Sequence, residues 1–378
     1  MMIRSFLPVG QGAFYCEQFE GWGDNEDVNI VYDCGSSTNV KLVEKQIRDN
    51  FYKDQTIHAV FISHLDDDHI NGIPFLLKYC HVKKMFFPLI TEKNTKYISL
   101  LNIIKNNGEE SFASLFVRDP YEAFNQFDIA DRPKLYKVEE NDQSGNNEID
   151  AMLIRSGENV IERILENVIY NSSLEREWLF IPYNFRQEDR LEFLQNELEN
   201  CFGKDMDSAD LQSIWENGTD TERNKIKDCY KKVKGSFNTN SMTLYSGMEA
   251  QVAIQYVGQG VNDTCHAKRY CCCDSKMAGC LYMGDYDASG KYKWKELYEA
   301  YDTYWENIGC IQIPHHGSKH NYNSKLAQLD AFYVMSAGAR NRYHHPHSIV
   351  IKDLLFNGHF PYIVTEYKCS ELHLVVDI

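Results

Sequence analysis

Short apolar runs bounded by turn residues are the clearest pattern along this chain. The runs 58–62, 279–283 and 308–313 are each typical of a buried strand. After the first run, Gly72, Ile73 and Pro74 precede three further apolar residues, which predicts that a helix begins there. Strand and helix signals alternate in this way near both ends of the chain, and this predicts a mixed α/β fold.

The middle of the chain has a helical pattern instead. Three groups of apolar residues predict helices there, the first with one clearly apolar face: Ile161, Ile164, Leu165, Val168 and Ile169; Leu191, Phe193, Leu194 and Leu198; and Leu211, Ile214 and Trp215. The polar run 139–147 predicts a flexible loop, and residues 259–264 predict a lengthened hairpin without identifiable chemistry.

Directly after the strand at 58–62 come side chains that bind metals, namely His64, Asp66, Asp68 and His69. On a tight loop between a strand and a helix, such short side chains can converge on one or two ions. Mixed imidazole and carboxylate ligands suit Zn²⁺, Mn²⁺ or Fe. The alternative interpretation is an acidic surface turn that carries two histidines.

Further candidate ligands follow the other two strands. Asp285 comes after one of them, and the pair His315 and His316 comes after the other. Loops at the strand ends of a rigid scaffold commonly carry functional groups, and the glycines beside these residues allow the backbone to approach an ion closely. With its two oxygens, Asp285 can bridge two cations about 3.5–4 Å apart, the spacing of two-metal hydrolases.

The pattern His-x-Asp-x-Asp-His-x-x-Gly at 64–72 resembles the metal motif of the metallo-β-lactamase superfamily, whose usual form has a second His where Asp66 stands. The Asp variant is similar to the metallo-hydrolase domain of ComEC-type DNA-uptake proteins. Other stretches resemble this branch in the expected order: 6–12, 31–36, 238–244, 281–285, 313–318 and 341–347. The resemblance covers roughly residues 1–90 and 236–365.

The resemblance implies a four-layer αββα sandwich with the metals at one edge. The first half of the core would span 1–90, a mainly helical insertion 91–235, and the second half 236–378. The insertion is expected to be either a lid over the metal cleft or a cap that only adds stability. A lid is slightly favoured, because inserted helices in this superfamily often roof the site.

The resemblance also implies which side chains hold each ion. One ion would take His64, Asp66 and Asp285. The other would take Asp68, His69, Asp285 and His316, with His315 as the alternative for the last position.

Asp66 makes the expected site rich in carboxylates, which favour Mn²⁺ more than an all-histidine site does. We therefore expect two divalent ions, with Mn²⁺ preferred and Zn²⁺ accepted. The family's middle histidine is missing, and Asn238, Asn240 or Ser241 stands in its place. One ion would then keep a weak or water-filled position.

The expected chemistry is hydrolysis of a phosphodiester by a metal-bound hydroxide, with Asp68 and Asp285 at the centre of the site. Arg342 can hold a phosphate bidentately, and His345 or His347 could protonate the leaving group. The alternative for each of these histidines is an exposed loop residue. Ser318 and Lys319 are weaker candidates for a phosphate contact.

Composition bears on the substrate, because the chain of 378 residues carries a net charge of −16. Proteins that bind long nucleic acids are usually basic on at least one face, and only 231–234 and 291–295 are strongly basic here. A nuclease acting on DNA or RNA is what the resemblance implies. The charge favours a phosphodiesterase on a small molecule, such as a signalling nucleotide or phosphorylcholine-type ester. A non-catalytic, partner-regulated subunit is the third class. A lactamase or thioesterase is disfavoured, because those branches generally have a second His where Asp66 stands.

The sequence predicts a cytoplasmic protein without a membrane anchor. It has no run of 18 apolar residues, and its N-terminus lacks the features of a secretory signal. Most of the twelve cysteines stand singly in apolar stretches, so reduced thiols are expected. A structural zinc at Cys271, Cys272 and Cys273 with Cys265 and His266 is a weak alternative. A protein partner, for example in a defence or DNA-processing module, is compatible with the sequence, which does not identify one.

Overall fold

The computed structural model covers the whole chain, and the structure describes residues 1–376 except 22–26, 91–94, 96–97, 100–108, 141–151, 167–177, 187–188, 205, 207, 233–239, 250–252, 255, 260–269 and 272–275.

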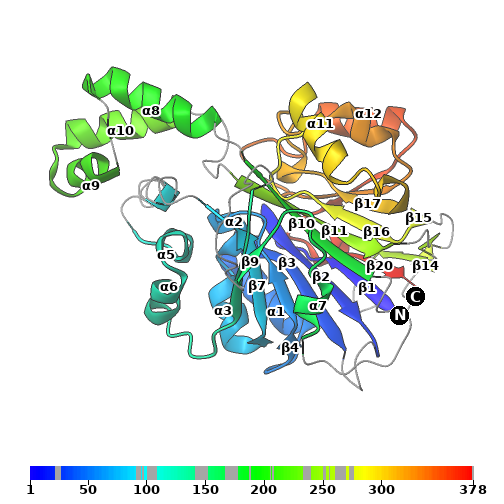
Figure 1. The fold of residues 1–378 in the computed structure, drawn as a ribbon. Coiled ribbons are helices and arrows are strands. Elements are labelled where there is room, and N and C mark those ends of the chain that lie inside the picture. The colour runs from blue at the N-terminus through cyan, green and yellow to red at the C-terminus, as the bar shows by residue number, and fades with distance from the viewer. Residues whose placement is uncertain are drawn as a thin grey trace.

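Two mixed sheets face each other (Figure 1). The first has the order β14 (Tyr270–Cys271), β13 (Tyr256–Gln259), β20 (Leu372–Val376), β1 (Met2–Phe6), β2 (Gly12–Phe19), β3 (Val28–Ser36), β5 (Ala59–Phe61), β7 (Lys84–Pro88), β8 (Lys134–Val138), β9 (Leu153–Ile154). The second has the order β10 (Trp178–Arg186), β11 (Asn240–Met248), β16 (Gly279–Tyr282), β17 (Ile308–Gln312), β18 (Phe332–Ser336), β19 (Pro361–Val364). Two short pairs complete the strands: β4 (Thr56–Ile57) with β6 (His81–Val82), and β12 (Ala253–Ile254) with β15 (Lys276–Met277). The predicted mixed α/β class is therefore confirmed.

Helices lie on the outer face of each sheet. Those of the first sheet are α1 (Val40–Asn50), α2 (Asp67–Ile70), α3 (Ile73–Tyr79), α5 (Phe112–Arg118) and α6 (Pro120–Gln126). Those of the second sheet are α11 (Lys291–Ala300) and α12 (Ser348–Phe356). Short 3₁₀ turns lie in the connections, at Trp305–Asn307, His315–Gly317, Ser324–Gln328 and Lys368–Ser370.

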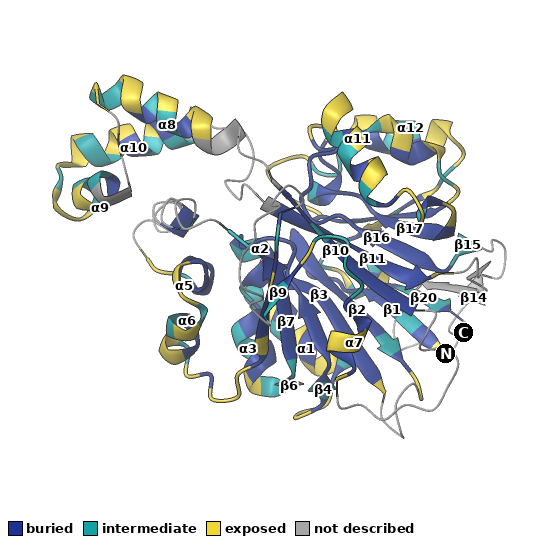
Figure 2. Ribbon diagram, in the orientation of Figure 1, coloured by how far each residue is buried: buried dark blue, intermediate teal, exposed yellow. Residues whose placement is uncertain are grey.

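Side-chain alternation along the strands produces three apolar cores. On β1, Met2 and Phe6 point into the core between the sheets, where Phe6, Tyr15 and Tyr282 pack ring against ring. The opposite faces of the sheets pack against the helices, for example Val31 with Val43 of α1 and Ile311 with Leu297 of α11. Figure 2 shows the resulting pattern of buried strands with helices exposed on one side. The layers therefore run helix, sheet, sheet, helix.

The segment 91–235 differs from the expected helical insertion. Its strands β8 and β9 extend the first sheet, and β10 pairs with β11 along its whole length in the second. The sequence reasoning missed these strands because it considered only helical spacing in this segment. Of the predicted helix at 161–169, the structure describes α7 (Ile161–Ile164), and Val168 and Ile169 lie outside the described residues.

The helical part of this segment is α8 (Asp189–Phe202), α9 (Ser208–Asn217) and α10 (Asp220–Lys232), as the other two apolar groups predict. These helices share a small core of their own that contains Leu194, Leu198 and Leu211. Figure 1 shows them set apart from the two sheets. Whether they act as a lid stays a prediction.

Two findings concern membrane-spanning helices and the state of the cysteines. Among the described residues, no helix combines the length and apolar character that crossing a bilayer requires. The eight cysteines whose side chains are described are free thiols. The cluster at 271–273, with Cys265 and His266, falls mainly outside the described residues.

Candidate metal centre

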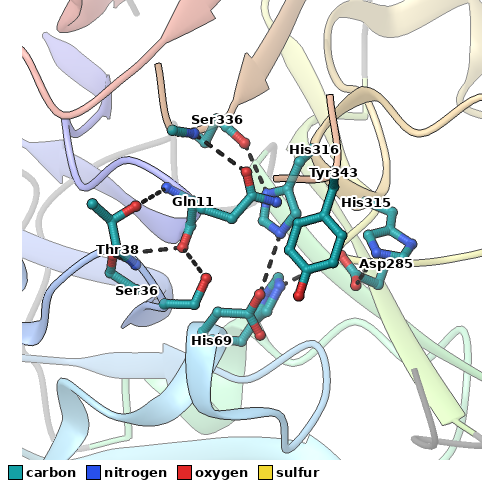
Figure 3. Close-up of polar contacts among 12 residues, drawn as sticks. Gln11, Ser36, Thr38, His69, Asp285, His315, His316, Ser336 and Tyr343 are labelled. Carbon is teal, nitrogen blue, oxygen red and sulfur yellow. Dashed lines mark hydrogen bonds and ion pairs between the residues drawn. The ribbon is translucent and has the colours of Figure 1, made fainter. Parts of the chain in front are cut away.

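Loops from both ends of the chain meet at one edge of the two sheets. His64 follows β5, and Asp68 and His69 lie in α2, which precedes α3 as the sequence predicts. Asp285 follows β16, and His316 follows β17. These strands belong to different sheets, so the sandwich itself brings the two halves of the cluster together (Figure 3).

Two overlapping groups of ligand atoms result, each with its atoms within 4.8 Å of one another: His64, Asp68 and His69, and then His69, Asp285 and His316. Asp285 Oδ1 lies 3.4 Å from His69 Nε2, and Asp285 Oδ2 lies 3.7 Å from His64 Nε2. On the other side, His316 Nε2 lies 3.4 Å from Asp68 Oδ2.

The atoms that face one another are buried and have no hydrogen bond. This holds for Nε2 of His64, His69 and His316 and for Oδ1 of Asp285. A buried polar group without a partner costs about 1–3 kcal/mol, so several at one point require an explanation. Divalent cations bound between these atoms would satisfy all of them, and imidazole with carboxylate is a donor set that suits such ions.

Contacts on the far side of each ring fix its orientation. His69 Nδ1 lies 2.8 Å from Asp33 Oδ2, and His316 Nδ1 donates to Ser336 O at 2.8 Å. His64 Nδ1 lies 2.9 Å from Ser63 Oγ, which itself donates to Asp33 at 2.7 Å. With the proton on Nδ1, each Nε2 keeps a lone pair directed into the cluster, as in protein metal sites generally.

Asp33 is the residue that the sequence reasoning missed. It is fully buried at the end of β3, where it accepts from Ser63 N at 2.7 Å and contacts His69. The Asp-x-Gly pattern after a strand was the available signal, but it gave no role to the carboxylate. Next to it, a Cβ at Gly35 would lie 2.6 Å from backbone atoms of α2, so glycine allows the helix to approach β3.

Uncommon backbone conformations are concentrated here. Among the described residues other than glycine, six have positive φ, and four of them are Asp33, His315, His316 and His344. Such conformations cost free energy and persist where the surroundings over-determine them, commonly at functional sites. At Gly284, which precedes Asp285, φ is +51° and a Cβ would lie 2.5 Å from Ser63 Cβ.

Three other positions that the sequence predicts as ligands lie outside the two groups of converging atoms: Asp66, His315 and the position of the missing middle histidine. Asp66 is buried at the start of α2, and it belongs to neither group of converging atoms among the described residues. His315 lies near the cluster, with its Nε2 3.6 Å from Asp285 Oδ2. Ser241 Oγ is buried without a hydrogen bond and lies against Gly284. Asn238 and the side chain of Asn240 lie outside the described residues.

The loop after β18 carries the predicted catalytic groups. The ring of His345 lies 5.5 Å from that of His315 and 6.3 Å from that of His316, and its buried Nδ1 has no hydrogen bond. Burial and these two neighbouring rings lower the pKa of His345 to about 4. His347 instead accepts from Ile349 N at 3.2 Å and caps α12.

Arg342 and Tyr343 are exposed in the same loop. Arg342 Nη2 donates to the Tyr343 hydroxyl at 2.8 Å. The Tyr343 ring lies 5.8 Å from that of His345. Arg342 therefore belongs to the exposed loop around the cluster and not to its buried centre.

Asp285 remains ionised in this environment. Burial would raise its pKa, but the imidazoles of His315, His64 and His69 hold the pKa of Asp285 well below its ordinary value. An ionised carboxylate surrounded by imidazoles is suited to binding cations.

One family model matches the part of the chain that carries three of these residues. The family described as Metallo-beta-lactamase superfamily matches residues 22–97, which include His64, Asp68 and His69. A solved structure of a beta-lactamase domain protein from Burkholderia ambifaria aligns with 38% of this chain and 41% of that one, at 17% identity and a TM-score of 0.21. The alignment spans less than half of either chain. No curated protein matches the sequence.

Removing the charge of Asp33 should weaken metal binding without removing a ligand. Asp33→Asn is expected to bind Mn²⁺ and Zn²⁺ about 10–100-fold more weakly in isothermal titration calorimetry, because His69 loses the carboxylate that fixes its tautomer. Asp49→Asn, on the exposed side of α1, is the matched control and should bind both ions as the unmodified protein does. Equal affinities for the two variants would contradict the role given to Asp33.

Proposed function

We propose that this chain, whose residues 22–97 match the metallo-beta-lactamase superfamily, is a dinuclear metal-dependent hydrolase that cleaves phosphodiester bonds, with DNA or RNA as its substrate. The observation that carries this proposal is the convergence of buried ligand atoms, among which Nε2 of His64, His69 and His316 and Oδ1 of Asp285 have no hydrogen bond among the described residues. The residues that would hold the ions are His64, His69, His316, Asp68 and Asp285. When bound there, the ions would supply an activated water at neutral pH and positive charge beside the attacked phosphate.

Access to the cluster supports a reaction there. The side chains of Asp68 and His315 are 20% and 22% exposed, whereas those of His64, His69 and His316 are almost fully buried. A phosphate would therefore approach from the side of Asp68 and His315. The buried histidines are shielded from solvent on the opposite side.

His345 is the candidate for assisting the leaving group. It is half-buried beside His315, on the exposed side of the cluster, and its Nδ1 has no hydrogen bond among the described residues. Its pKa of about 4 leaves the free imidazole neutral at pH 7. The negative charge of a bound phosphate would raise that pKa, and the protonated ring can then donate to the leaving oxygen as it separates from phosphorus. For Arg342, whose guanidinium is exposed, we propose a contact with a phosphate other than the scissile one and no part in proton transfer.

Mn²⁺ is the proposed metal and Zn²⁺ an accepted one, because the cluster includes Asp68 and Asp285 beside the imidazoles and Ser241 in place of a further histidine. The small-molecule phosphodiesterase is retained as the second candidate on the strength of the net charge of −16. A cytoplasmic location and a protein partner also stay proposals.

A direct assay separates these candidates. Protein purified without chelator, then stripped with EDTA and restored metal by metal, should cleave labelled single- or double-stranded DNA or RNA best with Mn²⁺. Cleavage of bis-p-nitrophenyl phosphate alone would favour the small-molecule substrate, and cleavage of neither would contradict the proposed function. Strict zinc dependence would contradict the metal assignment. The His64→Ala/Asp68→Ala variant is the control for contaminating nuclease.

His345 and His347 can be distinguished by the leaving group. His345→Ala should lower kcat on an oligonucleotide by about 10²-fold, because the leaving alkoxide needs a proton. On bis-p-nitrophenyl phosphate the loss should be small, since nitrophenolate departs without protonation. His347→Ala should retain kcat on both substrates and lose about 1 kcal/mol of stability to urea through the missing α12 cap. Equal losses on both substrates for His345→Ala would rule out the leaving-group role.

A further inference from the structure

Two loops around the metal cluster contain no carboxylate. Residues 315–325 and 337–349 carry Lys319, Lys325, Arg340 and Arg342 together with several histidines, and neither loop contains Asp or Glu. In the whole chain, by contrast, 55 acidic residues outnumber 39 basic ones. The charged side chains of these two loops are therefore all basic, and the same loops carry His315, His316 and His345 of the proposed site.

These loops pack directly against each other. His347 N donates to Gly317 O at 2.9 Å, and a Cβ at Gly317 would lie only 2.6 Å from Pro346 Cβ. Burial and the nearby Lys319, His320 and His344 lower the pKa of His347. The basic side chains of the two loops thus form one surface, which we call the basic rim: Lys319, His320, Arg342 and His344.

Neighbouring groups leave Lys319 and Arg342 as the strongest cations of the rim. Lys325 lies over the Trp294 ring at 5.7 Å, away from the cluster's own residues. Beside Arg340, Glu366 accepts from Ala339 N at 2.8 Å and places a carboxylate against that part of the loop. Asp353 contacts the loop 315–325, where it accepts from the Tyr322 hydroxyl at 2.7 Å.

The loop that carries Arg342 is held by Asn341. Its Oδ1 accepts from Tyr343 N at 3.1 Å and from His345 N at 2.9 Å, and its Nδ2 donates to Gly338 O at 2.7 Å. The Arg342 guanidinium lies 4.9 Å from the centre of the Tyr343 ring, and its bond to the hydroxyl limits its motion further. An arginine ordered in this way loses little entropy when it binds a phosphate.

We propose that Lys319 and Arg342 bind phosphates that flank the scissile one, so that the substrate is an extended polynucleotide strand. This inference rests on the proposed function. The scissile phosphate would already be neutralised by the ions, and a small phosphodiester offers nothing more for the rim to bind. A strand continues past the site on both sides and carries a phosphate at every nucleotide, whereas a small phosphodiester with a single phosphate carries none beside the scissile one.

Substrates of two lengths test the proposal. The kinetics of Lys319→Gln and Arg342→Gln would be measured on single-stranded 12-mers of DNA and RNA and on the dinucleotides TpT and UpU, which have no flanking phosphate. Each variant should lower kcat/KM on the 12-mer by about tenfold and change the dinucleotide rate less than twofold. The slope of log(1/KM) against log[salt] should become shallower by about 0.7 for each residue removed.

Controls separate a charge effect from a folding defect. Lys53→Gln, in the exposed turn before β4, should behave as the unmodified protein, and Arg342→Lys should keep the salt slope. If both variants lose as much on dinucleotides as on the 12-mer, or keep full activity on both, the flanking-phosphate role is overturned while the hydrolase remains. If the unmodified protein cleaves no phosphodiester with any metal, the proposed function itself fails.

Discussion

Buried imidazole and carboxylate atoms that face one another without hydrogen bonds are the constraint on which this structure depends. Four such atoms, on His64, His69, His316 and Asp285, lie between the two sheets' loops. Each costs about 1–3 kcal/mol when it has no partner, and the cost is avoided if cations bind among them. The sandwich holds these atoms together because β5 and β16 belong to opposing sheets.

Residues behind the cluster make it rigid. Asp33, Ser63 and Ser336 each contact the outer nitrogen of a histidine, so every Nε2 is directed inward before an ion arrives. The left-handed backbone of His316 and Asp33 is a further cost that the surrounding packing supports. The basic rim differs from this buried cluster, because its charged groups are exposed to solvent and can bind groups that lie outside the cluster.

The sequence could predict the parts of the site that depend on local spacing. The buried strand, the loop at 64–69 and the start of α3 are neighbours along the chain, and apolar runs mark the strands before Asp285 and His316. It could not predict the contact of Asp33 with His69, which joins residues 36 positions apart. It also missed β10, which pairs with β11, although the helices α8–α10 separate these two strands along the chain. The residue type suggested His347 as a general acid, but its Nδ1 accepts from Ile349 N and caps the start of α12.

Metal content measures the central claim most directly. Protein purified without chelator should contain about two divalent ions per chain by inductively coupled plasma mass spectrometry, the number used in two-metal hydrolases. A crystal examined at the metal's absorption edge should place those ions among His64, His69, His316, Asp68 and Asp285. A chain that stays metal-free in excess Mn²⁺ and Zn²⁺, or a crystal with Asp285 and His316 far from His69, would contradict the account.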